Sequence, residues 1–461
     1  MTGSLRGHGS TVLVAALAAA FGVGLLGATE VLSSVTPSGG EGETTRVMLT
    51  VVALVFTAIS IYVAAIVTTN TVATIVAGRV RTIALRRLLG SSARSERSRI
   101  AREGLTAGAI GATIGALVAL GLVAAFIAIG TANGVLPNAG YAFVTGTMTI
   151  SVAAVIASTW LAAWVGSRRV LAVTPIEALG VAVPASATDI PRRRSRGAIA
   201  ASLGGVGVLL LALAVVVGAM SPLAMLIGLA GGVVTFTALM IGSVLIVPGL
   251  LRATGMIFGR SPAATLGARN ALRHPERSTR AAIGLVIGVA LVTMFVVAGM
   301  TAQDIIVAKA EAEWGTAAPL DGTLGAIMAI MSSLVGYSAI IAAVGLVNTL
   351  TVGVLQRTRE FGLVRALGLS RGQLHATISV EAVQLTLVAV VLGFTLGVLY
   401  GWVGAVSLLG SVRPAFVTAP VIPWWLPVGL LVVGAMLSLV GSLAPARRAA
   451  AISPVAAIAV E

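Results

Sequence analysis

The stretch NTLTVGVLQRTREFGLVRALGLSRGQLHATISVE, residues 348–381, decides how the rest of this chain is interpreted. Apolar runs long enough to cross a bilayer lie on both sides of it, while its middle is rich in arginine. Arg and Lys collect on the cytoplasmic side of membrane proteins. We therefore predict that the stretch is a cytoplasmic connector between two membrane-spanning helices.

An earlier, degenerate copy of the stretch lies at residues 70–103, NTVATIVAGRVRTIALRRLLGSSARSERSRIARE. The copies align without a gap when the numbering is shifted by 278, and most of the matches are polar. The matched pairs include Asn70 and Asn348, Arg79 and Arg357, Arg81 and Arg359, Leu85 and Leu363, Arg87 and Arg365, Gly90 and Gly368, and Glu103 and Glu381. Self-similarity of this kind indicates an internal duplication.

The core of the later copy, RTREFGLVRALGLSRGQL over residues 357–374, resembles the permease subunits of the FtsX/MacB-like superfamily of ABC transporters. Residues 268–292 and 444–458 resemble the segments that lead into and out of that family's four-helix unit. The resemblance extends over 261–461 and, in degenerate form, over 45–180. It implies a transmembrane subunit that is driven by an ATPase.

The composition excludes a soluble globular protein, because 57% of the residues are hydrophobic and only 10% are charged. The chain has no cysteine, which excludes disulfides and thiolate metal sites. Its three histidines lie far apart in the sequence. We therefore predict no metal site.

The formal net charge of +15 is compatible with nucleic-acid binding, but the distribution of the charge argues against it. Nearly all of the basic residues fall in segments that share one side of the predicted membrane topology. The other side holds only Arg46, Lys309 and Arg413. The arginines therefore orient the protein with its basic loops in the cytoplasm, facing membrane lipid headgroups, and we predict no nucleic-acid partner.

The lysine content of the sequence excludes a nucleotide-binding P-loop. The pattern Gly-x-x-x-x-Gly-Lys-Ser/Thr needs a lysine that holds the phosphates. The single lysine of the chain, Lys309, is followed by Ala310 and Glu311 instead. We predict that the chain is not an enzyme and carries no cofactor, and that ATP and Mg²⁺ bind a separate ATPase polypeptide.

Ten stretches are apolar over about 20 residues, the length that crosses a bilayer as a helix. They predict membrane-spanning helices at 11–33, 47–69, 105–130, 142–166, 198–219, 223–249, 281–302, 325–347, 376–404 and 423–444. An even number of spans places both termini in the cytoplasm. The predicted fold class is an all-α polytopic membrane protein.

The duplication divides these spans into two parallel four-helix units of the FtsX-like type. We predict a first, degenerate unit at 1–180 with a coupling segment at 70–104. A second unit at 261–461 has its coupling segment at 348–375. A basic linker and a two-helix hairpin at 181–260 join the two units.

The two connectors are the candidate ATPase-coupling sites, because the resemblance implies that role for them. The candidate residues are Arg357, Arg359, Glu360, Phe361, Gly362, Arg365, Leu367 and Gly368 in the second copy, and Arg79, Arg81, Leu85, Arg87 and Gly90 in the first. The position of Glu360 is occupied by Thr82 in the first copy. The alternative is an interfacial helix whose arginines contact lipid headgroups.

A second group of polar residues, which could form an interface or a cavity, is associated with the predicted spans. Its members are Asn70, Asn348, Tyr62, Tyr337, Glu103 and Glu381. The two asparagines are candidates for hydrogen bonds between the halves. The tyrosines either line a central cavity or pack between helices. The glutamates lie at the cytoplasmic mouth of a span, where either a structural ion pair or a role in transport is expected.

The sequence predicts an ABC transporter permease that exports or extracts a hydrophobic or amphipathic substrate, such as a lipid, peptide or drug. We expect two copies of a cytosolic ATPase on each chain. The Ala-, Gly- and Arg-rich, Lys-poor composition is typical of a high-GC bacterium, which places the protein in a bacterial plasma membrane.

The alternative function is ATP-driven signalling that regulates a cell-surface partner such as a cell-wall hydrolase. Relatives with that role reach their partners through large outer domains. The outer loops predicted here, 34–46 and 303–324, are too short to fold as independent domains.

Overall fold

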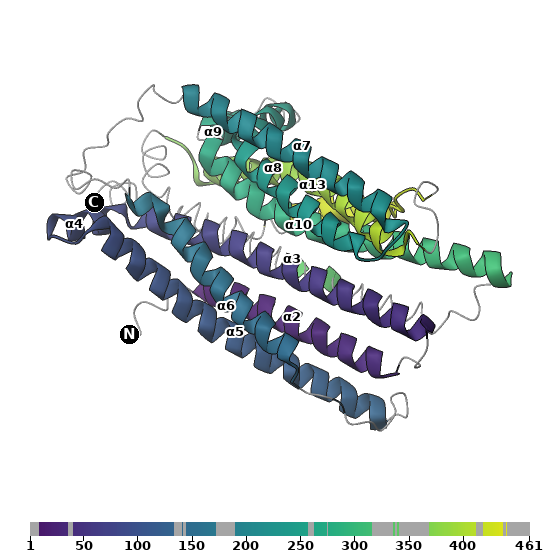
Figure 1. Ribbon diagram of the computed structural model, residues 1–461. Coiled ribbons are helices and arrows are strands. Elements are labelled where there is room, and N and C mark those ends of the chain that lie inside the picture. The colour runs from purple at the N-terminus through teal and green to yellow at the C-terminus, as the bar shows by residue number, and fades with distance from the viewer. Residues whose placement is uncertain are drawn as a thin grey trace. The chain divides into compact units, whose positions relative to one another are not determined.

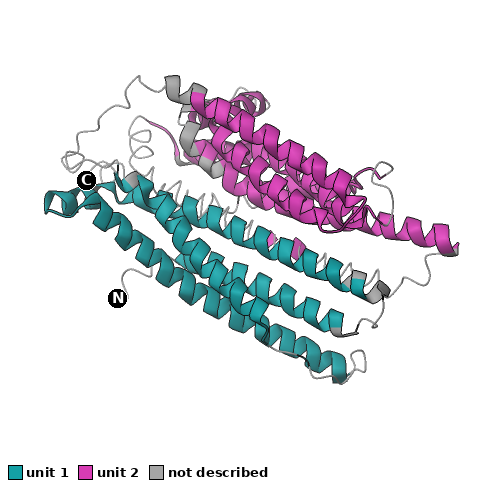
Figure 2. Cartoon of the chain, viewed as in Figure 1, with its two compact units in different colours: residues 1–187 teal, residues 188–461 magenta. Residues whose placement is uncertain are grey.

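The computed structural model describes most of the chain, and every regular element within the described residues is a helix. The described residues are 9–35, 40–132, 141, 144–171, 190–256, 262–273, 275–315, 335–336, 339–340, 368–411, 418–436 and 439. The chain divides into two compact units, residues 1–187 and residues 188–461 (Figure 2).

The first unit is a bundle of long helices with a short helix at one end. Its elements are α2 (Gly9–Val35), α3 (Gly40–Gly78), α4 (Val80–Leu88), α5 (Ala93–Ala132), α6 (Gly146–Gly166) and the short 3₁₀ helix η1 (Ser167–Leu171). The long helices α2, α3, α5 and α6 pack alongside one another, and α4 lies at the end of the bundle (Figure 1).

Glycines let the backbones of this bundle approach one another closely. A Cβ at Gly115 of α5 would overlap the carbonyl group of Ala16 in α2, and a Cβ at Gly104 would overlap the methyl group of Ala163 in α6. Small residues at helix crossings are typical of membrane proteins, in which close van der Waals packing drives helix association.

The second unit contains α7 (Ile190–Gly218), α8 (Ala224–Gly255), α9 (Pro262–Arg273), α10 (Pro275–Trp314) and α13 (Arg371–Leu409). The hairpin formed by α7 and α8 packs against α13 within this unit. The helices α10 and α13 pack closely, since glycines of α13 lie against the side chains of Val289 and Thr293 in α10.

Eight described helices are long and apolar enough to cross a membrane. They are Gly9–Ser33, Arg46–Gly78, Ala93–Ala132, Gly146–Gly166, Ser195–Gly218, Ala224–Gly255, Ala282–Glu313 and Gly372–Leu409. They confirm eight of the predicted spans, so the chain is an all-α, multi-pass membrane protein. The span predicted at 325–347 lies largely outside the described residues, and the one at 423–444 is described as a helix over Trp425–Met436.

Some helices continue beyond the apolar runs that predicted them. The span predicted at 47–69 belongs to a helix that ends at Gly78, and the span predicted at 105–130 to a helix that begins at Ala93. Residues 93–104 are rich in arginine, a good helix former, which lets α5 begin within the basic connector. Residues 70–78 contain no arginine and nevertheless extend α3. Asn70 consequently lies within α3 rather than at its end.

The two copies of the connector end in the same turn. Gly90 and Gly368 have φ angles of +99° and +104°, a conformation that glycine adopts without a steric penalty. Two residues later, the hydroxyl groups of Ser92 and Ser370 accept hydrogen bonds of 3.1 and 3.2 Å from a backbone N–H further along the chain. Each serine thereby caps the helix that follows, α5 or α13.

Candidate functional site

In the first connector, α4 packs against buried apolar side chains of the neighbouring helices. One face of α4, formed by Ile83 and Ala84, is buried at the end of the bundle. The surrounding side chains come from α3, α5, α6 and η1 and are Val72, Val76, Ile100, Ala163 and Val170. A helix as short as α4 is marginal in water on its own, so this packing holds it in place.

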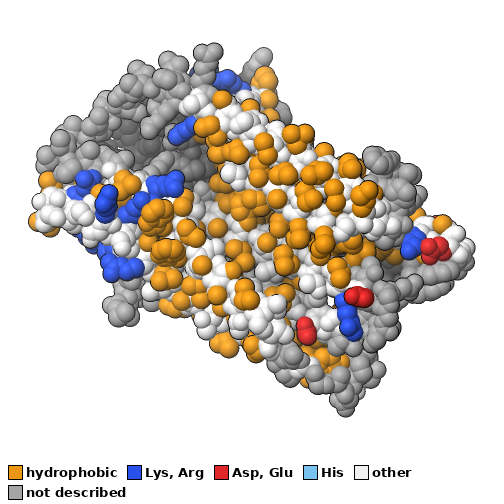
Figure 3. Space-filling view, viewed as in Figure 1, with side chains coloured by type: hydrophobic (Ala, Val, Ile, Leu, Met, Phe, Trp, Pro, Cys, Tyr) orange, Lys and Arg blue, Asp and Glu red, His pale blue; other side chains and the backbone are white. Residues whose placement is uncertain are grey.

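Another face of α4 is apolar and exposed. It consists of Leu85 and Leu88 together with Leu89, the residue that directly follows α4, and Leu89 is 88% exposed. Arginine side chains gather around the end of the unit that carries α4 (Figure 3). Exposed apolar side chains rimmed by polar groups mark interaction sites. We refer to Leu85, Leu88 and Leu89 as the docking face.

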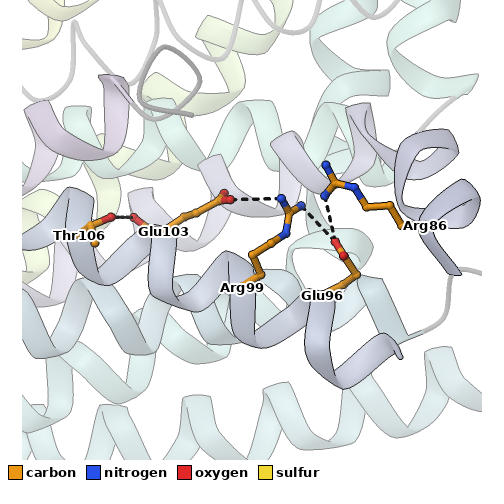
Figure 4. A network of polar contacts seen from close by, with 5 residues as sticks. All are labelled: Arg86, Glu96, Arg99, Glu103 and Thr106. Carbon is orange, nitrogen blue, oxygen red and sulfur yellow. Dashed lines mark hydrogen bonds and ion pairs between the residues drawn. The ribbon is translucent and has the colours of Figure 1, made fainter. Parts of the chain in front are cut away.

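A series of ion pairs joins α4 to α5 (Figure 4). Glu96, in the first turn of α5, is only 6% exposed. Its Oε2 lies 3.3 Å from Nη1 of Arg86 in α4 and 3.1 Å from Nη2 of Arg99 in α5. Nη1 of Arg99 lies 3.5 Å from Oε1 of Glu103. One buried carboxylate therefore bridges arginines of two helices.

Arg97 joins the same end of α5 to α6. Its guanidinium group lies 3.6 Å from the centroid of the Trp164 ring, and it donates hydrogen bonds of 3.2 and 3.0 Å to the Trp164 carbonyl oxygen. Because this carbonyl lies in the last turn of α6, the cation also interacts favourably with the helix dipole. The ends of α4, α5 and α6 are thus linked by polar contacts as well as by apolar packing.

Glu381, the second-copy counterpart of Glu103, has a partner from a different helix. Nδ2 of Asn270 in α9 donates a hydrogen bond of 2.8 Å to Oε2 of Glu381. One turn further along α13, Nε2 of the fully buried Gln384 donates a hydrogen bond of 2.5 Å to the carbonyl oxygen of Leu251 in α8. These bonds attach α13 to α8 and α9.

The candidate residues of the first copy are described, whereas most of those in the second are not. Arg79 precedes α4 and is exposed, Arg81 lies within α4, and Arg87 is half-buried in its last turn. Tyr62 and Asn70 are half-buried in α3. The candidates outside the described residues are Asn348, Tyr337, Arg357, Arg359, Glu360, Phe361, Gly362, Arg365 and Leu367.

The ion pairs on Glu96 were not predicted from the sequence. A signal was present, because Glu96, Arg99 and Glu103 have the i, i+3, i+7 spacing that places charges on one side of a helix. Comparison of the two copies does not reveal it, since the residue aligned with Glu96 is Leu374.

A family model described as FtsX-like permease C-terminal matches this chain twice, at residues 54–175 and at residues 332–454. Together the two matches cover more than half of the chain, with one match in each half. They confirm the duplication and the resemblance that were inferred from the connectors.

Three similar proteins illustrate the extent of the likeness. An uncharacterized ABC transporter permease of Bacillus subtilis strain 168, YknZ, is 30% identical over 141 residues, which are 30% of this chain and 34% of that protein. The pyoverdine export ATP-binding/permease protein PvdT of Pseudomonas aeruginosa is 33% identical over 137 residues, 30% of this chain and 19% of PvdT. The macrolide export ATP-binding/permease protein MacB of Rhodopirellula baltica is 33% identical over 138 residues, again 30% of this chain and 19% of the relative. The similarity therefore spans between a fifth and a third of each relative.

Proposed function

This chain belongs to the FtsX-like permease family, and we propose that it is the membrane-spanning subunit of an ABC transporter. In this proposal a separate cytosolic ATPase hydrolyses ATP, and the chain uses the resulting movement to export or extract a hydrophobic or amphipathic substrate. The names of PvdT and MacB combine an ATP-binding and a permease function, which supports an ATPase partner for this permease.

The docking face of α4 is the observation that carries the proposal. Three leucines are exposed on and directly after a short helix whose other face is buried among α3, α5, α6 and η1. Apolar side chains on a firmly held helix are suited to a groove in a partner protein, and the surrounding arginines suit acidic side chains at the rim of that groove. Because α4 is attached to three of the long helices, a displacement of α4 would be passed to them.

The second connector supports a second docking site of the same kind. Gly368 and Ser370 repeat the turn that Gly90 and Ser92 form in the first copy. The residues before this turn, 348–367, lie outside the described part of the chain, but their sequence carries the family motif. We therefore propose that two copies of the ATPase bind each chain, one at each connector.

The proposed substrate is one that reaches the protein from within the membrane. In the first unit α2 ends at Val35 and α3 begins at Gly40, which leaves no room for a folded domain between these two helices. A substrate that needs no receiving domain outside the membrane, such as a lipid, a hydrophobic peptide or an amphipathic drug, fits this organisation. The export named for PvdT and MacB supports outward movement.

Purification with the candidate ATPase tests the proposal. The chain is co-expressed with the ATPase that is encoded beside it, and the two are purified in detergent. Native mass spectrometry then gives the mass of the complex. We expect a complex with two ATPases per chain, and ATPase activity that rises when the complex is placed in phosphatidylglycerol-containing vesicles. A chain that binds no ATPase in this experiment is not a transporter subunit of the proposed kind.

A signalling function is the second candidate, and the extension of α10 past the other helices of its unit favours it. This helix spans 40 residues, or about 60 Å at 1.5 Å per residue, which is about twice the thickness of the hydrocarbon core. Its last turns, which contain Lys309 and Glu313, extend past the other helices of the second unit (Figure 1). A rigid extension of this kind could transmit ATP-driven movement to a surface protein. Transport of a fluorescent lipid by the complex in vesicles would favour export over signalling.

A further inference from the structure

We propose that Glu96 is the positioning residue that fixes α4 to α5 in the first unit, and that the apolar residues aligned with Arg86 and Glu96 in the second copy, Val364 and Leu374, can replace this ion pair. The first copy uses ion pairs centred on one buried carboxylate, whereas the residue aligned with that carboxylate in the second copy is a buried leucine, Leu374. The functional consequence of this inference rests on the proposed docking role of α4.

The first part of the argument is the geometry of the ion pairs. Arg86 comes from α4, while Glu96 and Arg99 come from α5, so the carboxylate of Glu96 is the link between the two helices (Figure 4). The pair with Arg86 is also a hydrogen bond of 3.3 Å. The turn at 89–92 and the buried cluster that contains Ile83 and Ala84 of α4 and Ile100 of α5 also connect the two helices.

The second part is burial. The side chain of Glu96 is 7% exposed, whereas the side chains of Arg86 and Arg99 are 41% and 38% exposed. A carboxylate this deeply buried is stable as an ion only when its charge is compensated nearby. The arginines can reach water without Glu96, but Glu96 depends on them. The carboxylate is therefore the member of the group whose position restrains the others.

The third part is the comparison with the second copy. At the shift of 278, Leu374 replaces Glu96, Val364 replaces Arg86 and Thr377 replaces Arg99. Leu374 lies in the first turn of α13 and is 1% exposed, so the aligned position is buried in both copies. The aligned position thus carries a charged side chain in the first copy and an apolar one in the second, while Val364 lies outside the described residues.

This difference predicts how the two connectors respond to mutation. Glu96→Gln removes the charge that holds Arg86 of α4 and Arg99 of α5 together, whereas replacing both Arg86 and Glu96 by apolar residues can preserve the contact between the two helices. In the first unit, a single substitution at Glu96 should loosen α4. The pair found in the second copy, grafted onto the first, should hold α4 again.

Spin-label distance measurements on the purified chain test the inference without any ATPase. Because the sequence has no cysteine, Thr82→Cys on α4 and Thr113→Cys on α5, both at exposed positions, provide the only labelling sites. The distance distribution between the labels is recorded for the parent chain, for Glu96→Gln and for the graft Arg86→Val with Glu96→Leu. Arg102→Gln, which removes an exposed charge from α5, is the matched control.

We expect Glu96→Gln to broaden the distribution about twofold, because α4 is no longer held by the compensated carboxylate. The graft and Arg102→Gln should both keep the width of the parent chain. An unchanged width in Glu96→Gln would overturn the positioning role of Glu96. A graft as broad as Glu96→Gln would overturn the claim that apolar packing replaces the ion pairs. Neither result depends on whether an ATPase binds, so the proposed function is tested separately.

Discussion

Asn270 in α9 donates a 2.8 Å hydrogen bond to the carboxylate of Glu381 in α13. The first-copy counterpart of this carboxylate, Glu103, lies 3.5 Å from Arg99 of its own helix. Two glutamates that descend from one position of the repeat therefore have different partners. In the first unit the carboxylate extends the ion pairs on Glu96, and in the second it attaches a neighbouring helix.

Replacing Asn270 by alanine should destabilise the second unit. A hydrogen bond to a charged group contributes about 1.5–3 kcal/mol, and its loss leaves the half-buried carboxylate of Glu381 without this donor. We expect the free energy of unfolding, measured by SDS titration of the protein in mixed micelles, to fall by about that amount. Glu381→Gln keeps an acceptor for Asn270 and should cost less. Equal losses in the two variants would show that the bond to Asn270 is not the relevant contact.

Placing a charge on the docking face should abolish ATPase binding. Leu89 is 88% exposed, so Leu89→Asp is not expected to disturb the bundle. If Leu89 enters an apolar groove, an aspartate there is desolvated without a partner, and the affinity should fall at least about tenfold. Binding is measured by biolayer interferometry with the purified ATPase.

Met220 provides the control for this experiment. It is 87% exposed at the turn between α7 and α8, so Met220→Asp introduces the same charge at an equally exposed apolar position. We expect unchanged affinity for Met220→Asp. A similar loss in both variants would mean that the added charge acts non-specifically and that the docking face is not the binding site.

The second connector should be more sensitive to a positive charge than the first. Glu360 carries the acidic position of the family motif, whereas the aligned residue of the first copy is Thr82. Glu360→Arg reverses a charge and should sharply reduce ATPase association, while Thr82→Arg adds a charge beside existing arginines and should cost less. Native mass spectrometry of each variant with the ATPase gives the number bound. If Glu360→Arg still binds two ATPases, Glu360 is not part of the contact with the ATPase.

The sequence was sufficient for features that depend on local pattern. Apolar length located the helices, and the alignment of the two copies paired Gly90 with Gly368, which form the same turn in the structure. Features that depend on tertiary contacts could not be predicted from the sequence pattern. The burial of Glu96 arises because α4 folds back onto α5, and the exposure of Leu89 arises because Ile83 and Ala84 occupy the core instead.

The boundaries of the helices show the same limit. Hydropathy marks where a helix leaves the apolar part of the bilayer, but it does not mark where the helix ends. For this reason the span predicted to end at residue 69 continues to Gly78. The position of Asn70 within α3 follows from this extension, and its predicted role between the two halves stays a prediction.

The close contact of α5 with α2 gives the last prediction, which concerns stability. A Cβ at Gly115 would overlap the carbonyl group of Ala16, so Gly115→Ala must push the two backbones apart. Overpacking of this kind costs about 1–3 kcal/mol, and the thermal midpoint of unfolding in detergent should fall accordingly. Gly121 lies on the same helix with no atom within 4 Å of the corresponding Cβ position. Gly121→Ala should therefore leave the midpoint unchanged or raise it slightly, because alanine is the better helix former. If both substitutions lowered the midpoint equally, the contact between α2 and α5 would not be as close as the structure places it.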